Sequence, residues 1–287
     1  MKKKKTVSLI LGSGGARGMA HIGVIKWLEE NDYEIQSISG CSIGALIGGF
    51  YAAGKLDIYT EWLKTLDTFD MFKLLDFKGT GGLVSGFTLM QKLEELTGDY
   101  NIEELPIKFT AVATDINGEK EVWINTGSLL SAMRASISLP LFFTPHFHNG
   151  KLLLDGGILN PVPIAPTFHD TTDLSVAVNL GAENTNPIIL KQTIKDANFL
   201  SKVKQYVVDA TLPASGLEEN GFYSITNKSF DTMQSTIARM KLSAYPPDVE
   251  IKIPRSLCGS LDFDKINEII DYGYEVCAYT FKGREDA

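Results

Sequence analysis

The hydrophobic pattern of this chain alternates between short apolar runs and longer amphipathic segments. The short runs are rich in β-branched residues and are predicted to be strands: residues 6–11, 37–39, 107–114, 121–125, 152–155, 174–180 and 249–254. The longer segments carry apolar residues three or four positions apart and are predicted to be helices: residues 19–30, 45–53, 57–70, 89–97, 128–134, 189–210, 224–242 and 264–281. This alternation indicates an α/β fold with parallel strands.

A glycine-rich segment and an amphipathic segment have particular predictions. Residues 76–87 hold four glycines and are predicted to be a mobile loop, after which Thr88 caps the helix that begins at Leu89. The helix at 224–242 is expected to pack on the sheet, the alternative being a lid that meets lipid. Its apolar stripe consists of Ile225, Met233, Ile237 and Met240.

Length and composition favour one globular domain. At 287 residues, with 44% hydrophobic and 22% charged residues, the chain can bury a large core. We find no repeat and no linker, and expect a single domain over residues 1–287, with a catalytic core at about 5–185 and a helical C-terminal portion at about 186–287. The formal net charge of −8 and the lack of a basic stripe argue against nucleic-acid binding.

Charge and cysteine distribution also bear on location. The only basic run, Lys2–Lys5, is interpreted as a solvated terminus, with weak membrane attraction as the alternative. The apolar segment Val7–Leu11 is too short for a signal peptide, and no stretch reaches the ~18 apolar residues of a membrane span. The cysteines have spacings that fit neither disulfides nor zinc, so we expect a cytoplasmic protein, peripheral at most to a membrane, without a metal. They are Cys41, Cys258 and Cys277.

A glycine-rich loop, Gly12–Gly18, lies between the first predicted strand and helix. Backbone N–H groups converge where such a loop enters a helix, which suits a phosphate or an oxyanion. The dinucleotide fingerprint fails because Arg17 stands where its last glycine should be, and the Walker A lysine is missing. An oxyanion loop is the interpretation that remains, with nucleotide binding kept as a rival.

The second predicted strand leads into GCSIG, in which Ser42 is flanked by Gly40 and Gly44. A serine between a strand and a helix, with glycine two residues away on each side, is the pattern of a nucleophile elbow. This loop and the first one leave the same end of adjacent parallel strands. A serine hydroxyl and free N–H groups would then flank one carbonyl, as a serine hydrolase requires.

Residues 152–157 read LLLDGG and end another predicted strand at Asp155, followed by Gly156 and Gly157. A carboxylate at the carboxyl end of a parallel strand, next to backbone that can bend, suits catalysis. Asp-Gly also marks type I′ hairpin turns, so a simple turn stays open as an alternative.

Taken together, these segments resemble the patatin-like phospholipase family. The matching blocks are Leu11–Val24, Gly40–Gly49, Arg134–Pro145 and Asp155–Gly157. The resemblance implies a three-layer α/β/α fold, with Ser42 as the nucleophile and Asp155 as the base. It also implies an oxyanion hole from the backbone of Gly14, Gly15 and Arg17. Where many members have three successive glycines, this chain has Ser13 before the pair.

The resemblance implies a lipid acyl hydrolase that cleaves a phospholipid or another fatty-acyl ester through an acyl-serine, without a cofactor. A Ser-His-Asp esterase using His169 is the runner-up, because the order of the three residues fits. His21 is interpreted as a local hydrogen-bonding residue, and His146 and His148 are expected at the far end of the strand that carries Asp155. A catalytically silent relative that binds lipid or a protein partner is the rival from another class.

Overall fold

The computed structural model describes residues 4–66, 70, 74, 84–140, 142–183, 222–259 and 265–285. Its centre is an eight-stranded sheet with the order β5-β6-β3-β2-β1-β7-β8, in which β4 also pairs with β3. Strands β3, β2, β1, β7 and β8 are parallel, whereas β4, β5 and β6 join by antiparallel pairing. The strands are β1 Lys5–Leu11, β2 Tyr33–Cys41, β3 Lys108–Asp115, β4 Lys120–Ile124, β5 His146–His148, β6 Lys151–Asp155, β7 Leu174–Ala182 and β8 Val249–Pro254. The predicted α/β fold with a mainly parallel sheet is confirmed.

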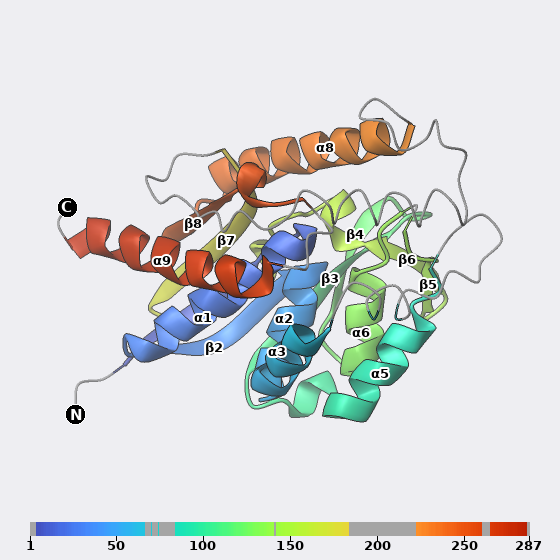
Figure 1. Ribbon diagram of the computed structural model, residues 1–287, viewed down its shortest axis with the longest axis horizontal. Helices are drawn as coiled ribbons and strands as arrows, with labels where there is room; N and C mark the ends of the chain where they lie inside the picture. Colours follow the sequence, from blue (N-terminus) through green and yellow to red (C-terminus); the bar gives the residue numbers. More distant parts are fainter. Residues whose placement is uncertain are drawn as a thin grey trace.

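Helices cover both faces of this sheet (Figure 1). In β1, Leu9 and Leu11 belong to the large core beneath α1, α2 and α9, whereas Ile10 belongs to a smaller cluster with Ala238 and Leu242 of α8. Because successive side chains of a strand point to opposite faces, α8 covers the face opposite to α1. The described α-helices are α1 Ala20–Glu30, α2 Ile43–Ala52, α3 Leu56–Thr65, α5 Phe87–Thr97, α6 Leu129–Ser136, α8 Phe222–Ala244 and α9 Ile266–Glu285.

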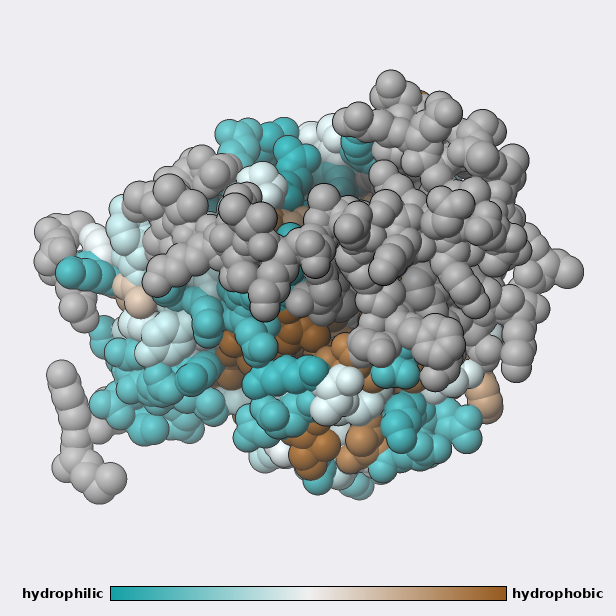
Figure 2. Space-filling view, in the orientation of Figure 1, coloured by the Kyte–Doolittle hydropathy of each residue, from teal (hydrophilic) through white to brown (hydrophobic). Residues whose placement is uncertain are grey.

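Hydrophilic side chains dominate the coloured surface in Figure 2, and apolar ones show mainly in groups at the lower centre. Within the described ranges, no helix is long and apolar enough to cross a membrane.

Two helix predictions were wrong at their ends. The helix predicted for residues 57–70 ends at Thr65, because Leu66 turns to an extended ψ of 125°. Helix α5 begins at Phe87 rather than Leu89, after Gly86 in a left-handed conformation (φ 70°), and Thr88 lies inside its first turn instead of capping it. Most of the loop predicted at 76–87, and the whole helix predicted at 189–210, lie outside the described residues.

Helix α8 lies against the sheet, but three of the four residues of the stripe predicted to pack there are exposed, and the fourth, Ile237, is half-buried. Ile225, Met233 and Met240 are 53%, 56% and 67% exposed. The buried side of α8 carries smaller and more polar side chains, because it rests on backbone loops as well as on strands. Those buried residues are Gln234, Ser235, Ala238 and Leu242.

Helices α1 and α9 lie side by side in Figure 1 and meet through two glycines. A Cβ at Gly23 would lie 1.9 Å from the carbonyl oxygen of Ile270, and a Cβ at Gly273 would lie 2.1 Å from that of Ala20. Any side chain at either position would therefore collide with backbone of the other helix.

We expect Gly273→Ala to lower the free energy of unfolding by about 1–3 kcal/mol, since the added methyl group forces α9 away from α1. The matched control is Gly283→Ala in the same helix, where nothing lies within 4 Å of the added Cβ. This control should be neutral or stabilising by up to about 1 kcal/mol, because alanine is the better helix former. Urea unfolding measures both, and equal effects would contradict the close contact.

Candidate active site

Ser42 stands in a tight turn between β2 and α2, with φ 55° and ψ −129°. A positive φ is rare for a residue with a side chain and stores about 1–3 kcal/mol of strain. A Cβ at Gly40 would lie 2.5 Å from the carbonyl oxygen of Gly44, and a Cβ at Gly44 would lie 2.1 Å from that of Leu11. Both motif glycines are therefore required by close backbone approach, as expected for an elbow.

The loop after β1 is held by its neighbours on two sides. The N–H of Gly12 donates to the carbonyl of Val178 at 3.1 Å, and the N–H of Ser13 donates to that of Pro161 at 2.8 Å. His21 Nε2 lies 2.9 Å from the carbonyl oxygen of Gly12 and therefore carries the proton. Burial lowers the pKa of His21 to about 4, so this ring is neutral and has the local structural role predicted for it.

The two glycines that follow open a short 3-10 helix, η1 Gly15–Met19. Gly15 has φ 58°, and Gly14 is extended. The N–H groups that begin a helix lack partners within it, so those of Gly14 and Gly15 are free to bind an anion. A Cβ at Gly18 would lie 2.3 Å from the side chain of Ile43, the residue after the candidate nucleophile. The loop and the elbow are thus packed directly against each other.

The third residue predicted for the oxyanion hole, Arg17, lies inside η1, and its side chain is 5% exposed. Its guanidinium is 3.7 Å from Asp231 Oδ1 on α8 and donates to the carbonyl of Arg255 at 3.4 Å. The side chain of Arg17 thus ties η1 to α8.

Asp155 lies beside the elbow because of a strand pairing that the sequence did not predict. Along β3, Val112 pairs with Cys41 of β2, and the next residue, Ala113, pairs with Asp155 of β6. At Ala113 the opposite edge of β3 is paired with β4. Strand β6 must therefore pair along the same edge of β3 as β2, beginning where β2 ends. Strand β6 runs antiparallel to β3, so the expected reason, a parallel strand ending with its neighbours, was wrong. The two strands instead meet end to end, which brings Asp155 beside the elbow.

The segment after Asp155 bends into a second 3-10 helix, η3 Gly156–Ile158, and not into a hairpin turn. A Cβ at Gly156 would lie 2.1 Å from the carbonyl oxygen of Val112, so only glycine fits there. The N–H of Gly157 donates to Asp155 Oδ1 at 2.7 Å. A Cβ at Gly157 would lie 2.2 Å from Gln234 Nε2 and 3.0 Å from Asp155 Oδ1, so both glycines of the predicted motif are explained by close approach.

The carboxyl group of Asp155 is almost fully buried, and this burial raises its pKa to about 6. The hydroxyl of Ser42 and the N–H of Gly157 act in the opposite direction. Oδ2 makes no hydrogen bond of normal length with any described residue, although Ser42 lies close enough to lower the pKa. This geometry leaves Oδ2 able to accept a proton.

The end of α6 connects the two candidate catalytic residues and was not singled out from the sequence. The N–H of Ser42 donates to Ser136 Oγ at 2.9 Å, and that hydroxyl donates to the carbonyl of Val112 at 2.7 Å. Two residues later, the carbonyl of Ser138 accepts the N–H of Asp155 at 3.0 Å. Only the resemblance of the block Arg134–Pro145 to a known motif could have pointed to this segment.

The two histidines of β5 lie at different positions along β6. His148 pairs with Lys151 at the end opposite to Asp155, as predicted, whereas His146 pairs with Leu153 in the middle of the strand, so the prediction was wrong for His146. Their rings contact Ser131 Oγ at 3.0 and 3.3 Å. Burial, together with the positive charge of Arg134, lowers the pKa of His146 to about 4.

His169 is exposed and follows the short 3-10 helix η4 Ala165–Thr167. The neighbouring Asp170 binds Ser8 in the first half of β1 and Lys108 at the start of β3. His169 therefore lies toward the amino ends of the parallel strands, whereas Ser42 follows the carboxyl end of β2. The structure does not bring the runner-up triad together.

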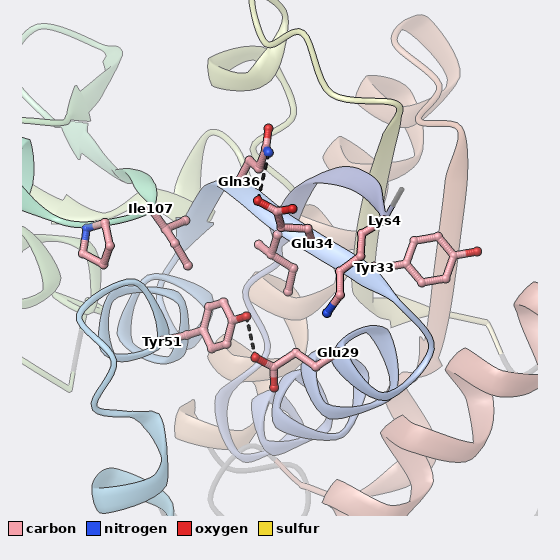
Figure 3. Close-up of a pocket in the computed structure, with 9 residues that line it drawn as sticks. Lys4, Glu29, Tyr33, Glu34, Gln36, Tyr51 and Ile107 are labelled. Carbon is pink, nitrogen blue, oxygen red and sulfur yellow. Dashed lines mark hydrogen bonds between the residues drawn. The ribbon is translucent and has the colours of Figure 1, made fainter. Parts of the chain in front are cut away.

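A hollow of the surface lies at the same amino ends (Figure 3). It is lined by Lys4, by residues 33–36 at the start of β2 and by Ile107, with Tyr51 bound to Glu29 at 2.8 Å. It is remote from the elbow. No group of three or more His, Cys, Asp or Glu side chains among the described residues could hold a metal ion.

Comparisons with known proteins agree with these observations. The family model of the patatin-like phospholipases matches residues 9–168. An uncharacterized NTE family protein of Mycobacterium tuberculosis is 35% identical over 319 residues, covering 93% of this chain and 89% of its own length. A lysophospholipase of Coccidioides immitis is 30% identical over 278 residues, covering 94% of this chain but 17% of its own.

Among solved structures, that of VipD from Legionella pneumophila is similar, with a TM-score of 0.52 over 98% of this chain and 67% of its own. At 15% identity, this similarity concerns the fold alone.

We expect Ser136→Ala to lower the free energy of unfolding by about 1–3 kcal/mol, because it removes the partner of the buried carbonyl of Val112 and of the part-buried N–H of Ser42. Ser131→Ala removes a hydroxyl from the same helix that contacts only histidine side chains, and should cost less. Urea unfolding of the two variants tests this, and an Ser136→Ala variant as stable as Ser131→Ala would argue against the anchoring role.

Proposed function

Because this chain belongs to the patatin-like phospholipase family, a family of esterases that act on lipids, we propose that it cleaves fatty-acyl esters with a Ser42–Asp155 dyad. The observation that carries this proposal is the end-to-end meeting of β2 and β6, which brings a buried carboxylate to a strained serine. A simple structural aspartate would not need an acceptor oxygen left open beside a serine hydroxyl.

In the first half of the reaction, Ser42 Oγ attacks the acyl carbonyl carbon while Asp155 takes the hydroxyl proton. The carbonyl oxygen becomes an oxyanion, and the N–H groups of Gly14 and Gly15 bind it, with that of Arg17 as a further candidate donor. The intermediate collapses, the ester bond breaks, and the leaving alcohol takes the proton from Asp155. The acyl group stays on Ser42.

In the second half, Asp155 takes a proton from water, and the resulting hydroxide attacks the acyl-serine. The same N–H groups bind the second oxyanion. Collapse releases the fatty acid and returns the proton to Ser42 Oγ, so that the enzyme is restored and one ester has been hydrolysed by one water.

An aspartate can replace histidine here because its environment makes it a better base. Burial raises the pKa of Asp155 to about 6, closer to neutral pH and therefore more effective in proton transfer. The oxyanion donors supply a further large part of the rate, since one such donor can contribute about 10²–10³-fold.

We propose a phospholipid or lysophospholipid as the substrate class. The support is the family itself and the relative named as a lysophospholipase. This chain spans about a sixth of that relative's length, so the substrate is carried over for the catalytic domain alone.

We expect Ser42→Ala and Asp155→Asn each to reduce hydrolysis of a p-nitrophenyl acyl ester by at least about 10³-fold, because each removes one partner of the dyad. His169→Ala should keep the activity of the unaltered chain, since His169 lies at the other end of the sheet. Full activity in Asp155→Asn would exclude the dyad, and an inactive but folded unaltered chain would favour a catalytically silent relative.

The pH dependence follows from the pKa of Asp155. The base must be ionised, so kcat/KM should rise with pH through a midpoint of about 6 and fall about tenfold per unit below it. Initial rates with a short-chain ester between pH 4 and 8 measure this. A midpoint near 4, the ordinary value for aspartate, would mean that the base is exposed or is another group.

A further inference from the structure

A buried amide on α8 touches the site from outside the segment that the family model matches. Gln234 is 9% exposed and lies beyond residues 9–168. Its Nε2 donates to Ser13 Oγ at 3.3 Å. A Cβ at Gly157 would lie 2.2 Å from the same nitrogen, so the amide rests against the backbone of Gly157. One side chain thus contacts both loops that build the site.

Its position is also near the carboxylate. A Cβ added at Gly157 would lie 2.2 Å from Gln234 Nε2 and 3.0 Å from Asp155 Oδ1, so these two atoms are at most about 5 Å apart. A charge at that distance shifts the pKa of a carboxyl group. Gly157 itself donates to Asp155 Oδ1. Movement of Gln234 would therefore displace the group that orients the base.

The inward face of α8 is unusual in its polarity. Asp231 faces Arg17 and Gln234 faces Ser13, whereas Met233 and Met240 point outward. Burying an amide is unfavourable unless it is hydrogen-bonded, and an amphipathic helix normally buries its large apolar residues instead. Departures from the usual burial of apolar residues occur mostly at functional sites.

We propose that Gln234 is a positioning residue of this hydrolase, which fixes Ser13 in the oxyanion loop and the Gly157 segment that orients Asp155. This inference rests on the proposed Ser42–Asp155 mechanism. It makes the seating of α8 a condition for an assembled site, because the oxyanion loop and the base segment are held by the same amide.

The other charged or titratable side chains near the site are already paired or neutral. Arg17 pairs with Asp231, and Glu121 pairs with Lys241. Burial raises the pKa of the Cys41 thiol well above its usual range, so it stays neutral. A negative charge introduced at residue 234 would therefore act directly on the pKa of Asp155.

Two substitutions test the proposal with a water-soluble short-chain ester. Gln234→Met keeps the length of the side chain but removes the donor, and should lower kcat about tenfold to a hundredfold with KM changed less than about twofold. Gln234→Glu places a carboxylate near Asp155 and should move the acid midpoint of kcat/KM upward by about half to one pH unit. Thr236→Glu, which adds the same charge on the exposed side of α8, should leave that midpoint in place.

A lower kcat with a nearly unchanged KM in Gln234→Met protein that unfolds cooperatively would support the positioning role, because a purely structural amide changes stability without changing turnover. A shifted midpoint in Gln234→Glu shows that residue 234 lies beside Asp155, as the proposal requires. A wild-type kcat in Gln234→Met, or an unshifted midpoint in Gln234→Glu, would overturn it. The proposed function fails differently, since the unaltered chain would then not hydrolyse the ester at all.

Discussion

The structure depends on the strained turn at Ser42. A residue with a side chain is held at φ 55°, and the turn closes only because Gly40 and Gly44 let backbone approach backbone. The strain is offset by packing of η1 on α2 and by the hydrogen bond from the N–H of Ser42 to Ser136. Because the turn ends β2 abruptly, the edge of β3 is left free for another strand.

Strand β6 uses that free edge, and the chemistry follows from it. Asp155 arrives from the opposite direction, is removed from water, and keeps one carboxylate oxygen without a normal hydrogen bond. Burial raises its pKa, and the N–H of Gly157 prevents a larger rise. The same tight packing that strains Ser42 therefore also places beside it a buried carboxylate with a raised pKa, which the proposed mechanism uses as its base in place of a histidine.

Much of the site could be predicted from local sequence, because a glycine loop, an elbow and a DGG segment each determine their own backbone. The sequence also predicted the local structural role of His21, whereas it left His169 open as the runner-up base. What it did not reveal are contacts between distant segments. The antiparallel direction of β6, the anchor at Ser136 and the inward face of α8 depend on packing. For α8, hydrophobic spacing selected the more exposed side, because the buried residues of the helix meet loops as well as strands.

The central claim is that the Ser42 hydroxyl is the nucleophile and that Asp155 activates it. Peptide mass spectrometry after treatment with a fluorophosphonate tests this most directly. We predict an adduct on Ser42 that forms quickly in the unaltered chain, forms far more slowly in Asp155→Asn and is absent in Ser42→Ala. An adduct on another residue, or equal rates on Ser42 with and without the carboxylate, would contradict the account.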